Sequence, residues 1–146
     1  MGVVETTYLR KIIHPFDNIV NSTYFTTNDT ATQTLNWIGS ACKDFCAFPV
    51  EVKSEMGFGL FEAQMGERHR KAKTLNGFGG AGVIEMIDDN RGDTFRTVYT
   101  VKFASVVYVL HAFQKKSKSG IATPQSDIQL IKRRLRDAEL QEQGEQ

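Results

Sequence analysis

The stretch FRTVYTVKFASVVYVLHAF, at residues 95–113, decides the fold. Its first half alternates between apolar and polar residues, its second half is almost continuously apolar, and the small residues Ala104 and Ser105 separate the two halves. This pattern predicts two antiparallel strands, residues 95–103 and 106–113, joined by a two-residue turn. The apolar second half predicts a strand in the middle of a sheet, covered on both faces.

The two-residue turn implies a definite register for this hairpin. Val98 then pairs with His111 and Arg96 pairs with Phe113, so Arg96 and His111 become diagonal neighbours on one face. The alternation over residues 95–103 predicts that this face is at least partly open and that the opposite face packs on helices.

The remaining elements follow outward from the hairpin. Residues 83–87 (VIEMI) predict a strand that reaches the hairpin through the turn-forming DDNRGD, and residues 35–38 (LNWI) are a candidate first strand. Residues 42–66 predict helical structure, with Pro49 suited to the first turn of the longer helix, and an amphipathic helix follows Thr123 and Pro124. Four basic residues are expected mostly on its outer side, namely Lys132, Arg133, Arg134 and Arg136. The predicted fold class is α+β: N-terminal helices packed on an antiparallel sheet meander, with a C-terminal helix.

A single domain accounts for most of the 146 residues. Residues 17–34 are rich in Thr and Asn and have no sustained period, which predicts a flexible N-terminal extension over residues 1–34 before a domain at residues 35–146. No apolar run is long enough to span a bilayer, and no secretory signal opens the chain, so we expect a cytoplasmic protein without membrane contact. Cys42 and Cys46 are expected to be reduced, packed thiols.

Charge is unevenly distributed, although the net charge is only +1. Residues 68–118 hold ten basic and four acidic side chains, whereas residues 1–67 hold four basic and eight acidic ones. A cationic middle third favours a polyanionic partner. Its cations include Arg68, Arg70, Lys71 and Lys73 in a predicted loop, and Arg96, Lys115, Lys116 and Lys118 in and after the hairpin.

The pattern of chemical groups narrows the reaction classes. No histidine pair, carboxylate cluster or Ser–His–Asp order predicts a metal site or a protease, so we expect neither metal nor cofactor. The glycines of residues 77–82 have the spacing of a dinucleotide fingerprint, but a strand follows where a helix is needed. Basic groups near Tyr99 and His111 suit RNA, whose self-cleavage needs a proton acceptor and a cation on the phosphate. Structural alternatives stay open: a packed imidazole for His111 and an ion pair for Arg96.

Five motifs, taken in order, resemble the phage-derived, HigB-type branch of the RelE/ParE toxin superfamily. They cover about residues 35–140 and read WIGSACKDFCAFP, KTLNGFGGAGVIEM, DTFRTVYTV, VYVLHAFQKKSKSGIATP and IKRRLRDAE. The resemblance implies a small fold with two N-terminal helices on an antiparallel sheet and a C-terminal helix. It also implies the toxin of a type II toxin–antitoxin pair, an mRNA interferase that cuts messenger RNA on the ribosome without metal. A helix-turn-helix antitoxin would neutralise it.

The resemblance also assigns roles to particular residues. Lys73 and Arg96 would stabilise the scissile phosphate, His111 or a lysine would move the proton, and Tyr99 matches the tyrosine of the same strand motif. RNA contacts would fall on Arg68, Arg70, Lys71, Lys115, Lys116 and Lys118.

The sequence departs from the family pattern at two positions. Phe95 stands where a tyrosine is usual, and Ile87 stands where many members carry an extra arginine. Two other readings therefore stay open: a ParE-like inhibitor of DNA gyrase, which needs no catalytic groups, and an inactive prophage remnant that only binds its antitoxin.

Overall fold

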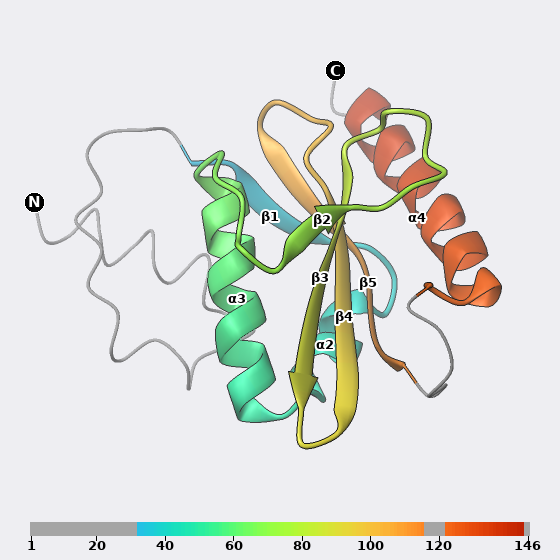
Figure 1. Ribbon diagram of the computed structural model, residues 1–146. Coiled ribbons are helices and arrows are strands. Elements are labelled where there is room, and N and C mark those ends of the chain that lie inside the picture. The colour runs from blue at the N-terminus through green and yellow to red at the C-terminus, as the bar shows by residue number, and fades with distance from the viewer. Residues whose placement is uncertain (1–31, 116–121, 145–146) are drawn as a thin grey trace, which may run out of the picture.

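The protein has three layers, seen here in a computed structural model that describes residues 32–115 and 122–144. Helices α2 (Ala41–Cys46) and α3 (Val50–Gln64) cover one face of a five-stranded sheet, and α4 (Gln125–Gly144) covers the other (Figure 1). The predicted α+β class, with helices at both ends of the fold, is confirmed.

The strands lie in the order β1–β5–β4–β3–β2. The predicted antiparallel meander is present as β3 (Val83–Asn90), β4 (Asp93–Thr100) and β5 (Val106–Lys115). The first strand, β1 (Thr34–Trp37), runs parallel to β5, so the sheet is mixed. The sequence reading missed β2 (Ala72–Thr74), a short edge strand inside the predicted loop, because three residues are too few to show a period.

The register of the β4–β5 hairpin was predicted correctly at one end and wrongly at the other. Val98 pairs with His111, as expected. A β-bulge between Val98 and Tyr99 then shifts the register by one residue, and β4 ends at Thr100. Residues 101–105 therefore form a five-residue connection in place of the predicted two-residue turn.

Both faces of the sheet are buried, so the prediction of a partly open face is wrong. The core on the α2 and α3 side is aromatic and aliphatic, with Phe45, Met56, Leu60, Met86 and Phe95 among its members. On the other side α4 packs Ile131, Leu135 and Ala138 against Val83, Val98 and Leu110. The alternating pattern misled because Arg96 and His111, which read as solvent-facing, are buried beneath α4.

The predicted helical stretch 42–66 consists of two helices separated by residues 47–49. Pro49 directly precedes α3, close to its predicted place in the first turn. α3 lies so close to the sheet that a Cβ at Gly59 would collide with Met86 Sδ. Cys42 and Cys46 on α2 are free thiols, and burial together with the neighbouring Cys46 raises the pKa of Cys42 to about 11.

The predicted N-terminal extension lies outside the described residues as far as residue 31. Its last residues belong to the fold, because the Gln33 N–H donates to the Gln64 carbonyl and Thr34 begins β1. Among the described residues, no helix is both long enough and apolar enough to cross a membrane.

Candidate functional site

Arg96, the centre of the predicted site, is only 2% exposed. β4 directs its side chain to the α4 side of the sheet, where Nη1 donates to Glu85 Oε1 at 2.9 Å and to the Thr123 hydroxyl at 2.7 Å. The Thr123 hydroxyl donates in turn to Glu85 Oε1. Arg96 therefore ties β3 and the residues before α4 together and does not project into solvent.

Lys73 is the predicted cation that stays accessible beside this pair. β2 places Lys73 opposite Glu85 at the sheet edge, with Nζ 3.7 Å from Glu85 Oε2 and half of the side chain, 50%, exposed. Two cations thus share one carboxylate, and the local excess of positive charge faces solvent at Lys73. Such a lysine is suited to contact a phosphate.

Sequence reasoning missed Glu85, although it organises this cluster. The signal was present: Glu85 is the one charged residue of VIEMI, and a charged residue inside an apolar strand is almost never buried without a partner. The pairing of Ile87 with Arg96 makes Glu85 and Arg96 diagonal neighbours on the same face.

Both ring nitrogens of His111 have protein partners. Nε2 lies 2.8 Å from Asp127 Oδ1, and Nδ1 lies 3.3 Å from Arg134 Nη1. Because a guanidinium can only donate, Nδ1 must be the acceptor and Nε2 must carry the proton. Burial lowers the pKa of His111, and the hydrogen bond that the ring donates to Asp127 only partly offsets this, which favours the neutral ring. His111 links β5 to α4.

Arg134 completes the link between α4 and the rest of the fold. Of the four basic residues predicted mostly on the outer side of the helix, it is the one that faces inward. Its Nη1 donates to the Leu110 carbonyl at 2.9 Å, and its Nη2 donates to the Ser40 hydroxyl at 2.7 Å. Gly39 has a φ of +58°, and a Cβ there would lie 3.0 Å from Arg134 Nε. The glycine thus leaves room for the guanidinium. Burial lowers the pKa of this guanidinium.

Tyr99 belongs to the core on the α3 side and is only 1% exposed. Burial is the main reason that the pKa of its hydroxyl rises to about 12, while Arg68 acts to lower it and Glu62 to raise it. Phe95 lies in the same core, where its ring packs edge-on against the ring of Phe48, and the ring centres are 5.0 Å apart. A phenylalanine at position 95 therefore fits its apolar surroundings.

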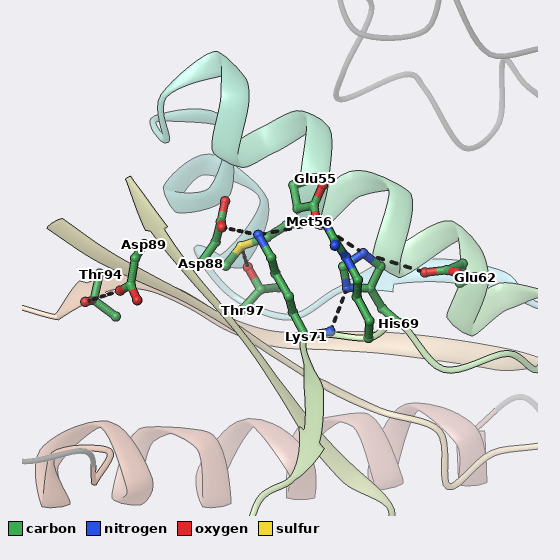
Figure 2. A network of polar contacts seen from close by, with 10 residues as sticks. Glu55, Met56, Glu62, His69, Lys71, Asp88, Asp89, Thr94 and Thr97 are labelled. Atoms are coloured by element: carbon green, nitrogen blue, oxygen red, sulfur yellow. Dashed lines mark hydrogen bonds and ion pairs between the residues drawn. The ribbon is translucent and has the colours of Figure 1, made fainter. Parts of the chain in front are cut away.

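Two cations of the predicted RNA-binding loop are held by carboxylates. Lys71 Nζ lies 2.6 Å from Asp88 Oδ1 and 3.4 Å from Glu55 Oε1, as Figure 2 shows, and Arg70 Nη2 lies 3.0 Å from Glu55 Oε1. The hydrogen bond to Asp88 is the main cause that raises the pKa of Lys71. Burial alone would raise the pKa of Glu55, but the neighbouring cations outweigh it and lower the pKa. The charge of this part of the loop is largely compensated.

His69 anchors the same loop under α3 (Figure 2). The Lys71 N–H donates to its Nδ1 at 3.2 Å, and its Nε2 lies 3.5 Å from Glu55 Oε1 and 3.8 Å from Glu62 Oε2. The sequence reading did not single out this histidine, because its partners come from a helix earlier in the chain.

Arg68 and Lys115 are the other predicted RNA-binding residues that the structure describes. Arg68 is exposed, and its Nη2 donates to the Thr74 hydroxyl at 3.0 Å, which brings a second accessible cation to the β2 edge. Lys115 is half-buried at the end of β5, and Lys116 and Lys118 lie outside the described residues. Within the described segments, no group of three or more His, Cys, Asp or Glu side chains is arranged to hold a metal ion.

Comparison with known proteins places the chain in a family. The family described as phage derived protein Gp49-like (DUF891) matches residues 43–136, which include β2 to β5 and the first half of α4. No curated protein and no solved structure matches the chain significantly. Because the match covers more than half of its length, the chain belongs to the phage-derived Gp49-like family, a member of the RelE/HigB-like toxin group.

Proposed function

We propose that this chain is the toxin of a type II toxin–antitoxin pair and a metal-independent, ribosome-dependent mRNA endonuclease. Its family supports the toxin role. The observation that carries cleavage is the half-exposed Lys73, held beside the buried Glu85–Arg96 pair at the β2 edge. A helix-turn-helix antitoxin neutralises the toxin.

The proposed reaction uses the 2′-hydroxyl of the RNA as nucleophile. Its oxygen attacks the adjacent phosphorus to form a 2′,3′-cyclic phosphate, and its proton passes to a base. The bond from phosphorus to the 5′-oxygen breaks, and that oxygen takes up a proton to leave as a 5′-hydroxyl. Lys73 stabilises the charge that develops on the phosphate, and Arg68 binds at the same edge. Arg96 is a positioning residue, because it holds the carboxylate of Glu85 that faces Lys73.

A lysine, rather than His111, moves the proton in this scheme. His111 uses both ring nitrogens in contacts with Asp127 and Arg134, and Tyr99 lies in the core. His111 and Tyr99 therefore support the sheet, while Lys115 and the lysines that follow β5 are the candidates for proton transfer. Arg70 and Lys71 bind RNA more weakly than Arg68, since both already contact carboxylates.

Ribosome-coupled cleavage of a defined mRNA, mapped by primer extension, tests the proposal. We expect Lys73→Met to reduce the cleavage rate by about 10²–10³ fold, the usual effect of removing one preorganised charge-stabilising group. The matched control is Lys102→Met, because Lys102 is similarly exposed, at 42%, and also faces a carboxylate, that of Glu139. Equal cleavage by Lys73→Met and the unsubstituted protein would remove Lys73 from the site.

Gyrase inhibition of the ParE type is the second candidate, and one observation favours it. Arg96 and His111 are buried and bound within the protein, and an inhibitor that only binds needs no accessible catalytic groups. Induced expression separates the candidates: an endonuclease cleaves mRNA and halts translation first, whereas a gyrase inhibitor causes early DNA damage with intact mRNA. Antitoxin binding without either effect would identify an inactive prophage remnant.

A further inference from the structure

The outer face of α4 carries three exposed cations, Lys132, Arg133 and Arg136. α4 starts two residues after Thr123, which contacts Glu85 and Arg96, so this face lies on the same side of the sheet as the proposed cleavage cluster. We propose that this α4 face, defined by Lys132, Arg133 and Arg136, docks the phosphate backbone of ribosomal RNA. The inference rests on the proposed function and names the surface by which the protein holds the ribosome.

Charge is segregated around α4, which leaves its outer face positive. Three of its carboxylates are bound by residues of the sheet or its loops: Asp127 by His111 at 2.8 Å, Glu139 by Lys102 at 2.6 Å, and Glu142 by the Tyr108 hydroxyl at 2.7 Å. Asp137 is the exposed exception. In the part of the chain that the structure describes, none of the three cations of the α4 face forms an ion pair.

The contrast with the loop before β2 makes this absence of ion pairs informative. Arg70 and Lys71 contact Glu55 and Asp88, so a phosphate would have to displace a carboxylate from each of them. No carboxylate of the described residues forms an ion pair with Lys132, Arg133 or Arg136, so a phosphate displaces none there. Release of counterions is the main driving force of phosphate-backbone binding, so the α4 face has more to gain from RNA.

α4 presents these cations on a fixed support. Arg134, on the inner side of the same turns, bonds to the Leu110 carbonyl and to Ser40. Lys132 Nζ lies 6.0 Å from the centre of the Phe78 ring, a cation–π contact that orients the lysine while leaving it exposed. Less conformational freedom is therefore lost when this face binds.

The composition of the face favours nucleic acid over protein. Protein–protein interfaces have an apolar centre that is depleted of charged residues, whereas interfaces with nucleic acid are polar and strongly positive. Leu140 is the large apolar side chain that is exposed along the described part of α4. It lies at the end of the α4 face, one turn beyond Arg136.

Binding to purified 70S ribosomes as a function of salt tests the inference. The test variant is Lys132→Gln/Arg133→Gln/Arg136→Gln, and the control is Lys43→Gln/Lys53→Gln/Arg91→Gln, which removes the same charge from α2, α3 and the β3–β4 turn. Glutamine is a good helix former, and thermal unfolding by circular dichroism verifies that both variants are folded. The slope of log Kd against log salt should fall by about 2–3 in the test variant, roughly one for each lost phosphate contact. The control should retain the slope of the unsubstituted protein, and an equal fall in both variants would overturn the inference.

Ribosome binding and mRNA cleavage are measured in separate assays. Lys73→Met should lose cleavage and keep most of the salt slope. A protein that shows the α4-dependent slope but never cleaves mRNA would refute the proposed function and leave the docking face in place. A test variant that binds ribosomes normally but loses affinity for its antitoxin would overturn the RNA assignment and make the α4 face a protein-docking surface.

Discussion

The helices on the two faces of the sheet are held to it by different kinds of contact. On the α3 side, aromatic and aliphatic side chains fill the core, and charged groups such as Arg70 and Glu55 stay at its rim. On the other side, α4 supplies few buried apolar side chains, and charged groups are buried there as well: Glu85 and Arg96 of the sheet and Arg134 of α4 itself. Apolar packing tolerates small shifts, whereas buried charges need their partners at fixed places. We therefore expect the α4 side to respond more strongly to single substitutions.

The largest effect should come from Arg96→Met. This change leaves the Glu85 carboxylate buried with its strongest partner gone, and we expect the free energy of unfolding to fall by about 3–5 kcal/mol. Urea denaturation followed by circular dichroism measures it. Glu85→Gln/Arg96→Met should recover part of the loss, because no buried charge then remains. A fall below about 1 kcal/mol would mean that the pair behaves like a surface salt bridge.

Arg134→Met is the next test of the α4 side. It removes hydrogen bonds to the Leu110 carbonyl and to Ser40, and we expect a loss of about 2–3 kcal/mol in the same unfolding measurement. The matched change on the α3 side is Arg70→Met, which breaks a contact with Glu55 between two partly exposed groups and should cost about 1 kcal/mol or less. Similar losses for both variants would remove the proposed difference between the faces.

The two faces should also lose stability in different pH ranges. The pKa of His111 is lower in the folded protein, so protonation favours the unfolded chain and stability is lost as the pH falls below the ordinary histidine value of about 6.5. The pKa of Glu55 is also lowered, and its contribution is lost only below the ordinary glutamate value of about 4.3. Unfolding free energies measured from pH 7.5 to about pH 2.5 should show both steps. His111→Gln should remove the first step alone, and its persistence would assign it to another group.

The smallest effect should come from the β3–β4 turn, which belongs to neither face. Arg91 and Gly92 have φ values of +50° and +85°, the two positive angles of a type I′ turn. Arginine is strained there and asparagine is not, so Arg91→Asn should raise the free energy of unfolding by about 0.5–1 kcal/mol. Thermal unfolding detects this as a higher Tm. A lower Tm would show that the contact of Arg91 with Glu51, at 3.8 Å, outweighs the strain.

The sequence by itself determined the elements whose patterns are local. The β3–β5 meander follows from alternation and turn residues, and the helices α3 and α4 follow from apolar spacing and their prolines. Only the tertiary structure decided that β1 runs parallel to β5 and that α4 covers the face holding Arg96. These features depend on which distant segments meet, and no local period encodes that.

The candidate site divides in the same way. Its residue types and the cationic middle third were evident in the sequence, because charge and side-chain chemistry belong to single residues. The fate of each cation was decided by contacts between distant parts of the chain: Arg96 with Glu85 and Thr123, Lys71 with Asp88. Whether a cation can bind a phosphate depends on burial and on the carboxylates around it, and only the folded chain determines both.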